Sequence, residues 1–357
     1  MKILHSVGSF INGGVETLLV NLANSQIQAG NDVAIMIVTK QYSKELISLL
    51  HKSVKVILIN KPIGSKNPLF WFKMSWIHYK FNPDILHLHG PASAKYFIHK
   101  NKKETRFVTL HNEVMDMPFH PSVDCYIAIS KCVKEAFLRK TKHDNCLICY
   151  NGVDFSKITT KKTYSKKPYR ILCIARVLFC TKAQDVVVEA FTKLPSHIKE
   201  SVTLDFWGDG PDLEKLKQIV DNKNLYKYIT ICGNMPNQYV NTHLCDYDVI
   251  IQASYHEGLG LCAIEAMGSK TPLILSRALG FLEVSNNGTY SHLFNCGDAE
   301  DLAKTLEIVY NNYSSSCLQA EKAYLWVNNT FSIEEYARQI NNIYTEYGRL
   351  LADICEK

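Results

Sequence analysis

The chain has 357 residues, of which 46% are hydrophobic and 21% are charged, and its formal net charge is +6. This composition excludes intrinsic disorder, and the length predicts two domains of about 150–180 residues each. No apolar run approaches the ~18 residues of a membrane span, and the N-terminus lacks the apolar segment of a signal peptide.

The first half of the sequence alternates short apolar runs with helical patterns. The apolar runs predict strands at residues 2–6, 33–38, 55–59, 84–88, 107–110, 126–129 and 147–150. Strands that alternate with helices form βαβ units, and such units build parallel sheets. We therefore expect an α/β domain of the Rossmann type over residues 1–165.

A polar and basic segment, residues 157–168, ends in Pro168 and predicts a linker. A second alternation follows it, with strands predicted at residues 170–175, 203–208, 229–232, 249–253 and 273–276. This pattern predicts a second Rossmann-like domain over residues 166–337. From Ser316 to the end the pattern is helical.

Twelve cysteines suggest disulfides or a zinc site, but their context favours neither. They lie in apolar segments, where cysteine behaves as a small hydrophobic residue. The one C-x-x-C, Cys146 to Cys149, falls in a predicted strand that would direct its two side chains to opposite faces. With no second pair to complete a tetrahedral site, a reducing cytoplasm fits best.

The segment from Tyr255 to Met267 is the most informative part of the chain. A predicted strand leads into Glu257, a glycine-rich turn (residues 258–260) and a helix that carries Glu265. The turn directs backbone N–H groups and a helix N-terminus to one place, which suits phosphate or sugar oxygens. Two solvated glutamates on an ordinary helix are the alternative, and the whole pattern argues against it.

Other motifs accompany this segment in a fixed order. They are Gly13-Gly14, Thr109-Leu110-His111-Asn112, Asn151-Gly152-Val153-Asp154, Arg176 with Lys182, Gly208-Asp209-Gly210-Pro211 and Gly233. Together with the two glutamates, eight residues apart, this order resembles the E-x7-E retaining glycosyltransferases of family 4, which have the GT-B fold. The resemblance extends over nearly the whole chain.

The resemblance implies two Rossmann-like βαβ domains whose parallel sheets face an interdomain cleft. It also implies that the last helix, about residues 338–357, returns to the first domain. Parallel sheets bind ligands beyond the carboxyl ends of their strands, and the motifs follow predicted strands. We therefore expect the motifs to converge in the cleft.

The resemblance assigns the leaving diphosphate to Arg176 and Lys182. Arginine can hold phosphate through two hydrogen bonds, and lysine acts as a point charge. In the family the lysine is followed by glycine, whereas this chain has Ala183. The missing glycine raises the question of whether the backbone around Lys182 keeps the family's conformation.

The nucleoside and the sugar have candidates by the same resemblance. Glu265 would bind the ribose hydroxyls, and backbone from Gly233 to Met235 would hold the base. Glu257 and the amides of Gly258, Leu259 and Gly260 would orient the sugar.

The first domain supplies the remaining site residues. His111 would lie beside the transferred sugar, and it stands above the other twelve histidines only because of its sequence context. Gly13 and Gly14, in the loop after the first strand, would also contact the donor.

No metal or other cofactor is expected. Asp246-Tyr247-Asp248 is formally the D-x-D of a different glycosyltransferase fold, but it precedes a predicted strand and lies at the wrong end of it. Arg176, Lys182 and helix N-termini would stabilise the leaving group in place of a cation.

Charge divides unevenly along the chain. Residues 1–150 hold 19 Lys and Arg against 10 Asp and Glu, a net charge of +9, whereas the remainder holds 21 against 24, a net charge of −3. A segment with Trp71, Lys73, Trp76 and Lys80 adds aromatic side chains at helical spacing. We expect much of this helix to pack in the core, and we expect its remaining Trp, Phe and Lys side chains to contact an anionic membrane. No recognition motif supports nucleic acid as the partner instead.

These inferences predict a cytoplasmic, metal-independent, retaining glycosyltransferase, with peripheral attachment to the inner face of the membrane. It would move a hexose from a nucleotide-diphosphate sugar, UDP-linked rather than GDP-linked, to a glycan. The expected acceptor is a lipid-linked intermediate of capsule, O-antigen or exopolysaccharide synthesis. The alternatives are a sugar-nucleotide epimerase of the same fold, or a catalytically silent nucleotide-sugar-binding subunit.

Overall fold

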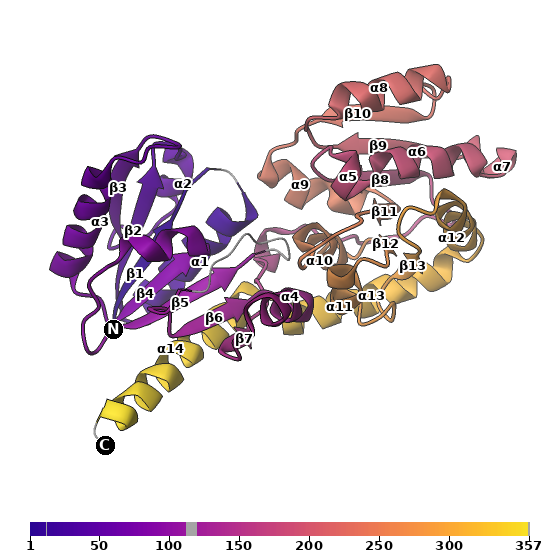
Figure 1. Cartoon of the computed structure of the whole chain (residues 1–357). Coiled ribbons are helices and arrows are strands. Elements are labelled where there is room, and N and C mark those ends of the chain that lie inside the picture. Colours follow the sequence, from indigo (N-terminus) through magenta and orange to yellow (C-terminus); the bar gives the residue numbers. More distant parts are fainter. Residues whose placement is uncertain (12, 112–119, 356–357) are drawn as a thin grey trace. The chain divides into compact units, whose positions relative to one another are not determined.

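The computed structural model describes residues 1–11, 13–111 and 120–355. The chain forms two compact units, Met1–Gly152 with Ile333–Lys357 and Val153–Ser332. Each unit is an α/β structure around one parallel sheet, as the sequence predicts (Figure 1).

The first unit contains a seven-stranded sheet of order β3-β2-β1-β4-β5-β6-β7, in which every pair is parallel. Its strands are β1 Lys2–Val7, β2 Asp32–Thr39, β3 Lys55–Lys61, β4 Ile85–His89, β5 Thr105–Leu110, β6 Cys125–Ala128 and β7 Cys146–Ile148. Each predicted strand of this half is confirmed. Long apolar runs identified them because strands covered on both faces need side chains suited to a core.

Helices cover this sheet. They are α1 Gly14–Gln28, α2 Lys44–Ser48, α3 Pro68–Phe81, α4 Lys131–Thr141 and α14 Ile333–Cys355, with the 3-10 helix η1 Pro91–Tyr96. The α14 residues Tyr336, Ile340 and Tyr344 pack with Leu18 of α1 and Phe107 of β5 in one core cluster. The return of the last helix to the first unit is therefore confirmed, although it begins at Ile333, earlier than predicted.

The second unit contains a six-stranded parallel sheet of order β10-β9-β8-β11-β12-β13. Its strands are β8 Arg170–Ile174, β9 Thr203–Trp207, β10 Ile229–Gly233, β11 Val249–Gln252, β12 Leu273–Ser276 and β13 His292–Phe294. The sequence did not predict β13. This edge strand has three residues and buries only Phe294, so it leaves no apolar run to detect.

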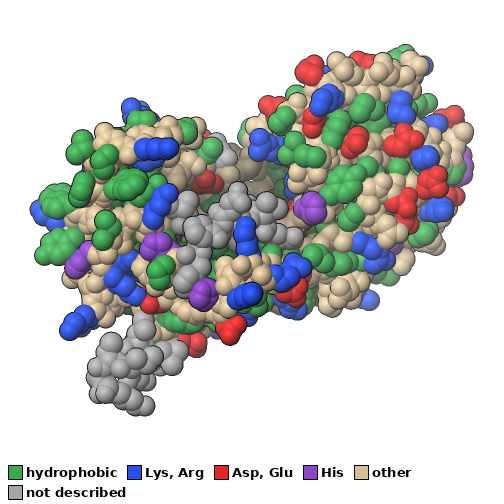
Figure 2. Space-filling model, in the orientation of Figure 1, with side chains coloured by type: hydrophobic (Ala, Val, Ile, Leu, Met, Phe, Trp, Pro, Cys, Tyr) green, Lys and Arg blue, Asp and Glu red, His purple; other side chains and the backbone are tan. Residues whose placement is uncertain are grey.

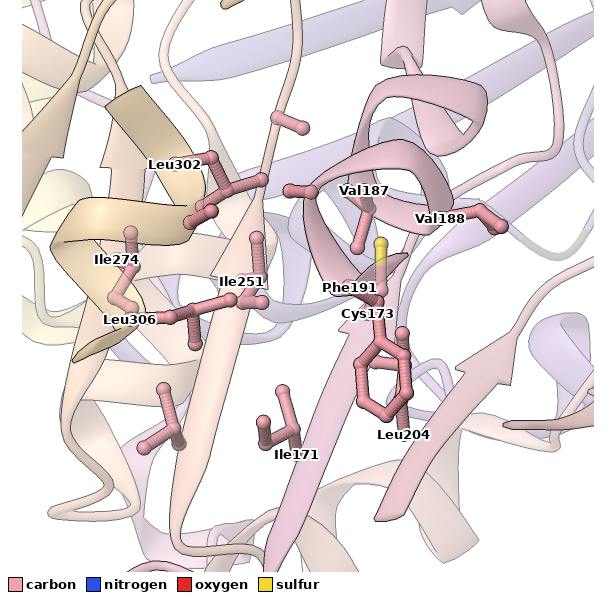
Figure 3. Close-up of a cluster of buried hydrophobic side chains, with 14 of the residues drawn as sticks. Ile171, Cys173, Val187, Val188, Phe191, Leu204, Ile251, Ile274, Leu302 and Leu306 are labelled. Carbon is pink, nitrogen blue, oxygen red and sulfur yellow. The ribbon is translucent and has the colours of Figure 1, made fainter. Parts of the chain in front are cut away.

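The helices of the second unit pack on both sides of its sheet. They are α5 Phe179–Lys182, α6 Gln184–Lys193, α7 Ser196–Lys199, α8 Leu213–Asn222, α9 Asn237–His243, α10 Leu261–Gly268, α11 Leu279–Val284, α12 Ala299–Asn311 and α13 Tyr313–Thr330, with 3-10 helices η2 Phe155–Lys157 and η3 Leu244–Asp246. Figure 3 shows how Phe191 of α6 and Leu306 of α12 pack with Ile171, Leu204 and Ile251 of the strands.

The segment predicted as a linker is packed structure of the second unit. Backbone N–H groups of Thr159 and Lys161 donate to carbonyls of Asn241 and Ser269. The hydroxyl of Tyr164 donates to Glu321 at 3.1 Å. The unit boundary therefore lies at Gly152, not at residue 165, because the lysines that suggested a solvated linker alternate with groups that bond to the sheet and helices behind it.

Helix α3 also departs from the prediction that much of it is core. Only Met74 and His78 of this helix are buried, because the helix packs mainly on the edge strand β3 and on η1. Phe70, Ile77 and Phe81 are half-buried, and the exposed apolar side chains are Leu69, Trp71, Phe72, Trp76 and Tyr79.

The cysteines that the structure describes are all free. None of the helices in the described part of the chain combines the length and apolarity needed to span a membrane.

Candidate functional site

Strand order places two of the predicted loops side by side. In the second sheet β8 and β11 are neighbours, and the order of strands reverses at this point. Loops that leave the carboxyl ends of two such strands form the ligand-binding crevice of an open parallel sheet. Arg176 follows β8, and Glu257 follows β11.

An ion pair joins these two loops. The Nζ of Lys182 lies 2.5 Å from Oε2 of Glu257, and the two side chains are 22% and 18% exposed. The hydroxyl of Ser254 donates to the same oxygen at 3.3 Å, and the N–H of Tyr255 donates to the carbonyl of Thr181 at 2.8 Å. Backbone and side chains thus hold the lysine and the glutamate together.

Ala183 has a backbone conformation that glycine adopts without strain. It lies between α5 and α6 with φ 51° and ψ 42°, in the left-handed region, and it is fully buried. A residue with a Cβ pays about 1–2 kcal/mol for this conformation. The local backbone is therefore formed despite the missing glycine, and Lys182 keeps its place.

Gln184 fixes the loop that carries Arg176. Its side-chain nitrogen donates to the carbonyl of Arg176 at 2.9 Å, and its oxygen accepts from the N–H of Leu178 at 3.3 Å. This buried amide thereby bonds to backbone on both sides of Val177.

Gly208 and Gly210 let the loop after β9 approach the segment of residues 175–177, which carries Arg176. A Cβ on Gly208 would lie 1.9 Å from the carbonyl oxygen of Ala175, and one on Gly210 would lie 2.2 Å from that of Val177. The arginine loop is therefore supported by Gln184 and by backbone. The guanidinium of Arg176 itself is exposed and has no ion-pair partner among the described residues.

The turn before α10 has the predicted geometry. Gly260 has φ +90°, and a Cβ there would meet the ring of Phe281 at 2.5 Å. The N–H of Gly280 donates to the carbonyl of Glu257 at 3.1 Å. No side chain caps α10, so its N-terminal N–H groups provide a positive dipole end beside Glu257 and Lys182.

Glu265 lies on α10, where its side chain is half-buried. Burial raises the pKa of its carboxyl to about 7. Near neutral pH this group can donate a hydrogen bond or, once ionised, accept two from neighbouring hydroxyls.

Gly233 is the last residue of β10, and Met235 follows it at the same edge of the sheet. Gly233 has φ +77°, and its carbonyl accepts from the N–H of Gly208 at 2.8 Å. Met235 is half-buried. Backbone groups from residue 233 to residue 235 thus adjoin the loop that supports Arg176.

Gly13, Gly14 and His111 belong to the first unit. Gly13 precedes α1 and Gly14 is its first residue, and no side chain caps this helix. His111 directly follows β5, and its ring stacks on that of His89 with centroids 6.1 Å apart. Burial lowers the pKa of His111 to about 4, so its imidazole is neutral at neutral pH. Asn112 lies outside the described residues, and convergence of the two sets in a cleft stays a prediction.

Asp248 of the D-x-D has a structural role. Its carboxylate accepts from the backbone N–H groups of Tyr169 and Arg170 and from the hydroxyl of Ser165 at 3.0 Å. These bonds attach the incoming chain to the start of β11, at the strand's amino end.

The sequence reasoning missed three residues that shape the site, namely Gln184, Ser254 and Gly280. Gln184 stands inside the motif that begins at Lys182, and this position could have revealed it. Ser254 lies three residues before Glu257 and could have been found from this proximity. Gly280 leaves no such signal, because its role depends on a close contact with Glu257 across the fold.

Two family models match the chain, and together they span almost all of it. "Glycosyltransferase Family 4" matches residues 12–157, and "Glycosyl transferases group 1" matches residues 155–326. The protein thus belongs to the group 1 glycosyltransferases of the family-4 type.

Individual relatives agree with this assignment. The chain is 24% identical over 367 residues to the phosphatidylinositol N-acetylglucosaminyltransferase GPI3 subunit of Saccharomyces cerevisiae, covering 93% of this chain and 80% of that one. It is 25% identical to the N-acetyl-alpha-D-glucosaminyl L-malate synthase of Bacillus anthracis, covering 78% of each. Among solved structures, Anabaena HepE in complex with UDP and glucose superposes with a TM-score of 0.79 at 18% identity, covering 97% of this chain and 99% of that one. The fold is GT-B.

Proposed function

We propose that the protein transfers a hexose from a UDP-sugar to a glycan, with retention of configuration and without a metal ion. The acceptor is a lipid-linked intermediate of capsule, O-antigen or exopolysaccharide synthesis. One observation carries the transfer activity. Lys182 and Glu257, from the loops after two neighbouring strands, meet beside the uncapped N-terminus of α10.

This arrangement suits the departure of a diphosphate. When the bond from the anomeric carbon to the phosphate oxygen breaks, negative charge grows on that oxygen. Arg176, Lys182 and the α10 N–H groups supply positive charge beside this oxygen. The acceptor oxygen bonds to the same face of the sugar, and its proton passes to the departing phosphate.

The carboxyl groups serve the uncharged parts of the donor. Glu265 accepts from the ribose hydroxyls, and Glu257 orients the sugar. Until the donor arrives, Glu257 holds Lys182, so binding of the diphosphate must exchange one anionic partner of the lysine for another. The ion pair thereby preserves the site without leaving a buried charge unpaired.

UDP is favoured as the nucleotide because HepE, which shares the fold, was solved with UDP and glucose. The relatives from yeast and Bacillus are named for N-acetylglucosaminyl transfer. A donor screen should therefore contain UDP-glucose, UDP-galactose, UDP-N-acetylglucosamine and GDP-mannose.

The screen measures thermal stabilisation and slow hydrolysis of each donor. One UDP-sugar should stabilise the protein and release UDP, and the liberated sugar should keep its anomeric configuration by NMR. Glu257→Ala should retain UDP binding and lose turnover. Conversion of the donor to its epimer would instead establish an epimerase, and binding without any hydrolysis or transfer would indicate a silent subunit.

The acceptor proposal rests on the exposed face of α3, which we call the α3 face. Leu69, Phe72, Trp76 and Tyr79 follow one another at helical spacing and are 69%, 68%, 58% and 63% exposed. The buried side of the helix lies elsewhere, at Met74 and His78. Monomeric soluble proteins rarely leave such a row of large apolar side chains in water.

Cations accompany the α3 face. The Nζ of Lys80 lies 4.6 Å from the ring centre of Trp76, and Lys66 and Lys73 are also exposed. Figure 2 shows hydrophobic side chains and lysines together over this part of the first unit. Each cation near anionic lipid contributes about 1 kcal/mol, and the aromatic side chains prefer the headgroup region. The α3 face therefore suits an anionic membrane that carries the acceptor.

Liposome flotation tests this attachment. The protein should float with vesicles that contain phosphatidylglycerol at low salt, and less so at high salt, because screening weakens the lysine contribution. The double variant Phe72→Ser and Trp76→Ser should bind weakly at either salt concentration. The matched control is the double variant Leu318→Ser and Leu325→Ser, at two similarly exposed positions on α13 of the second unit. This control should bind the vesicles as the wild type does. No flotation with anionic vesicles at low salt would favour a soluble acceptor.

A further inference from the structure

Three histidines that the proposed transfer does not use lie together in the first unit. His5 on β1 pairs in register with His87 on β4, and His89 follows two residues later on the same face of the sheet. One ring nitrogen from each residue lies within 4.8 Å of those of the other two. The rings of His87 and His89 stack with centroids 4.5 Å apart.

The surroundings of His5 determine which of its nitrogens carries a lone pair. Its Nε2 lies 2.7 Å from the side-chain oxygen of Gln26. Since that oxygen can only accept, Nε2 carries the proton and Nδ1 is left with the lone pair. The second-shell partner of a metal-binding histidine is typically such an acceptor, which fixes the ring and its tautomer.

The lone pair of His5 faces the ring of His89, whose Nε2 lies 3.1 Å from Nδ1 of His5. With no ion bound, Nε2–H of His89 donates to the lone pair on Nδ1 of His5, so an ion that takes both nitrogens as ligands must displace this proton, which moves to Nδ1 of His89. Two nitrogens bound to one tetrahedral ion at about 2.0–2.1 Å would be about 3.3 Å apart, so the pair is near a chelating geometry. Burial holds the pKa of all three histidines below their usual range, and neutral imidazole is the ligand form.

A second observation is independent of this spacing. The Nδ1 of His89 and both ring nitrogens of His111 are shielded from solvent and have no hydrogen-bond partner among the described residues. Such groups are rare in native proteins. His87 bonds to the hydroxyls of Tyr344 at 2.5 Å and Thr109 at 2.6 Å, and it would exchange one of them on binding an ion.

We propose that His5, His87 and His89 form a binding site for a divalent transition-metal ion of the zinc, nickel or copper class. Imidazole ligands without a carboxylate suit these ions and disfavour magnesium and calcium. Gln26 of α1 and Tyr344 of α14 contact two of the ligands, so a bound ion links both helices to the sheet. The site goes beyond the proposed transfer and takes no part in it.

The test uses the full-length protein, freed of affinity tags and of metal. Titration with CoCl₂ should produce the visible absorption of a four-coordinate nitrogen-rich site at one equivalent per chain, and ZnCl₂ should displace it. The melting temperature should rise with either ion. His5→Gln and His89→Gln should weaken binding at least tenfold, whereas His197→Gln, at an exposed histidine of the second unit, should not.

Gln26→Leu provides a variant that keeps all three ligands and nearly the same volume. It should weaken cobalt binding about 10- to 100-fold, the usual effect of removing a partner behind a ligand. Circular dichroism checks that each variant folds. Substoichiometric binding by the wild type, or unchanged affinity in folded His5→Gln, His89→Gln or Gln26→Leu, would overturn the proposal. Because no sugar nucleotide is present, the result is independent of the transfer activity.

Discussion

Arg176 and Lys182, the two residues proposed to bind the diphosphate, differ in whether their side chains already have a partner in the free protein. Lys182 is already paired with Glu257 at 2.5 Å. Arg176 extends into solvent from a loop that Gln184 and two glycines support. A fixed loop with a free guanidinium lets arginine adapt to a phosphate while the backbone beneath it stays in place.

Arg176→Ala should weaken UDP binding by about 2–3 kcal/mol, because a charge-assisted contact is lost without disturbing the loop. Calorimetry measures this, with Arg176→Lys expected to lie between the two. Lys227→Ala, at an exposed lysine of the same unit, should have no effect. Unchanged affinity in folded Arg176→Ala would remove this residue from the donor site.

Glu265 predicts a pH dependence of nucleotide binding. Burial raises the pKa of this carboxyl to about 7 in the free protein, and ribose hydroxyls that donate to it favour the ionised form and lower that pKa. Below pH 7 binding must therefore release a proton, so affinity should fall by up to about tenfold per pH unit and level off above pH 7. Glu265→Gln should remove this component. Because the diphosphate titrates nearby, the difference between wild type and variant is the decisive quantity.

At the scale of elements, the junction of α5 and α6 positions the lysine. The chain turns there through a left-handed residue, and Ala183 occupies the position where the family has glycine. The hydrogen bonds from the N–H groups of Lys182 and Ala183 to the carbonyls of Leu178 and Phe179 complete the short helix before it. A strained residue is maintained here because the flanking contacts determine its conformation.

Ala183→Gly should leave the free energy of unfolding unchanged or raise it by up to about 1 kcal/mol, since relief of strain offsets the greater freedom of the unfolded chain. Ala190→Gly, within the same α6 at a buried position, should cost about 1 kcal/mol. Urea unfolding of both variants gives the comparison. Equal destabilisation by the two substitutions would show that the junction carries no strain.

At the scale of the whole molecule, charge and chemistry divide between the two units. The second unit provides Arg176, Lys182, Glu257 and Glu265, whereas the first provides the α3 face and the histidines. The first unit holds 22 Lys and Arg against 15 Asp and Glu, a net charge of +7, and the second unit holds 18 against 19, a net charge of −1. This division fits the proposed function, in which specific cations of the second unit bind an anionic donor and the α3 face of the first unit meets a membrane.

We expect EDTA to leave the initial rate of transfer unchanged. The charge on the leaving group is addressed by arginine, lysine and a helix N-terminus, and Asp248 is committed to Tyr169, Arg170 and Ser165. Assays with EDTA and with added MgCl₂ should therefore agree. A loss of activity that magnesium restores would assign a metal to this region, whereas a loss that only zinc restores would implicate the histidine site in transfer.

The sequence predicted features that depend on local pattern. Apolar runs located twelve of the strands because buried parallel strands have near-continuous apolar sequence. The glycine-rich turn and the loops of Arg176, Lys182 and Glu257 followed from their order along the chain. What escaped was short or inconspicuous, such as β13, or was misjudged from composition, such as the segment around Lys161.

Only the tertiary structure decided which side chains meet. Whether an aromatic stripe on α3 is core or surface depends on how much of the sheet lies beneath it, and α3 packs mainly on the edge strand β3 and on η1. Three histidines on two strands became a cluster because β1 and β4 pair in register, although His5 and His87 are 82 positions apart in sequence. The pair of Lys182 and Glu257 likewise arises because β8 and β11 are neighbours. Local pattern encodes each element, but contacts between elements depend on strand order and register, which no single segment contains.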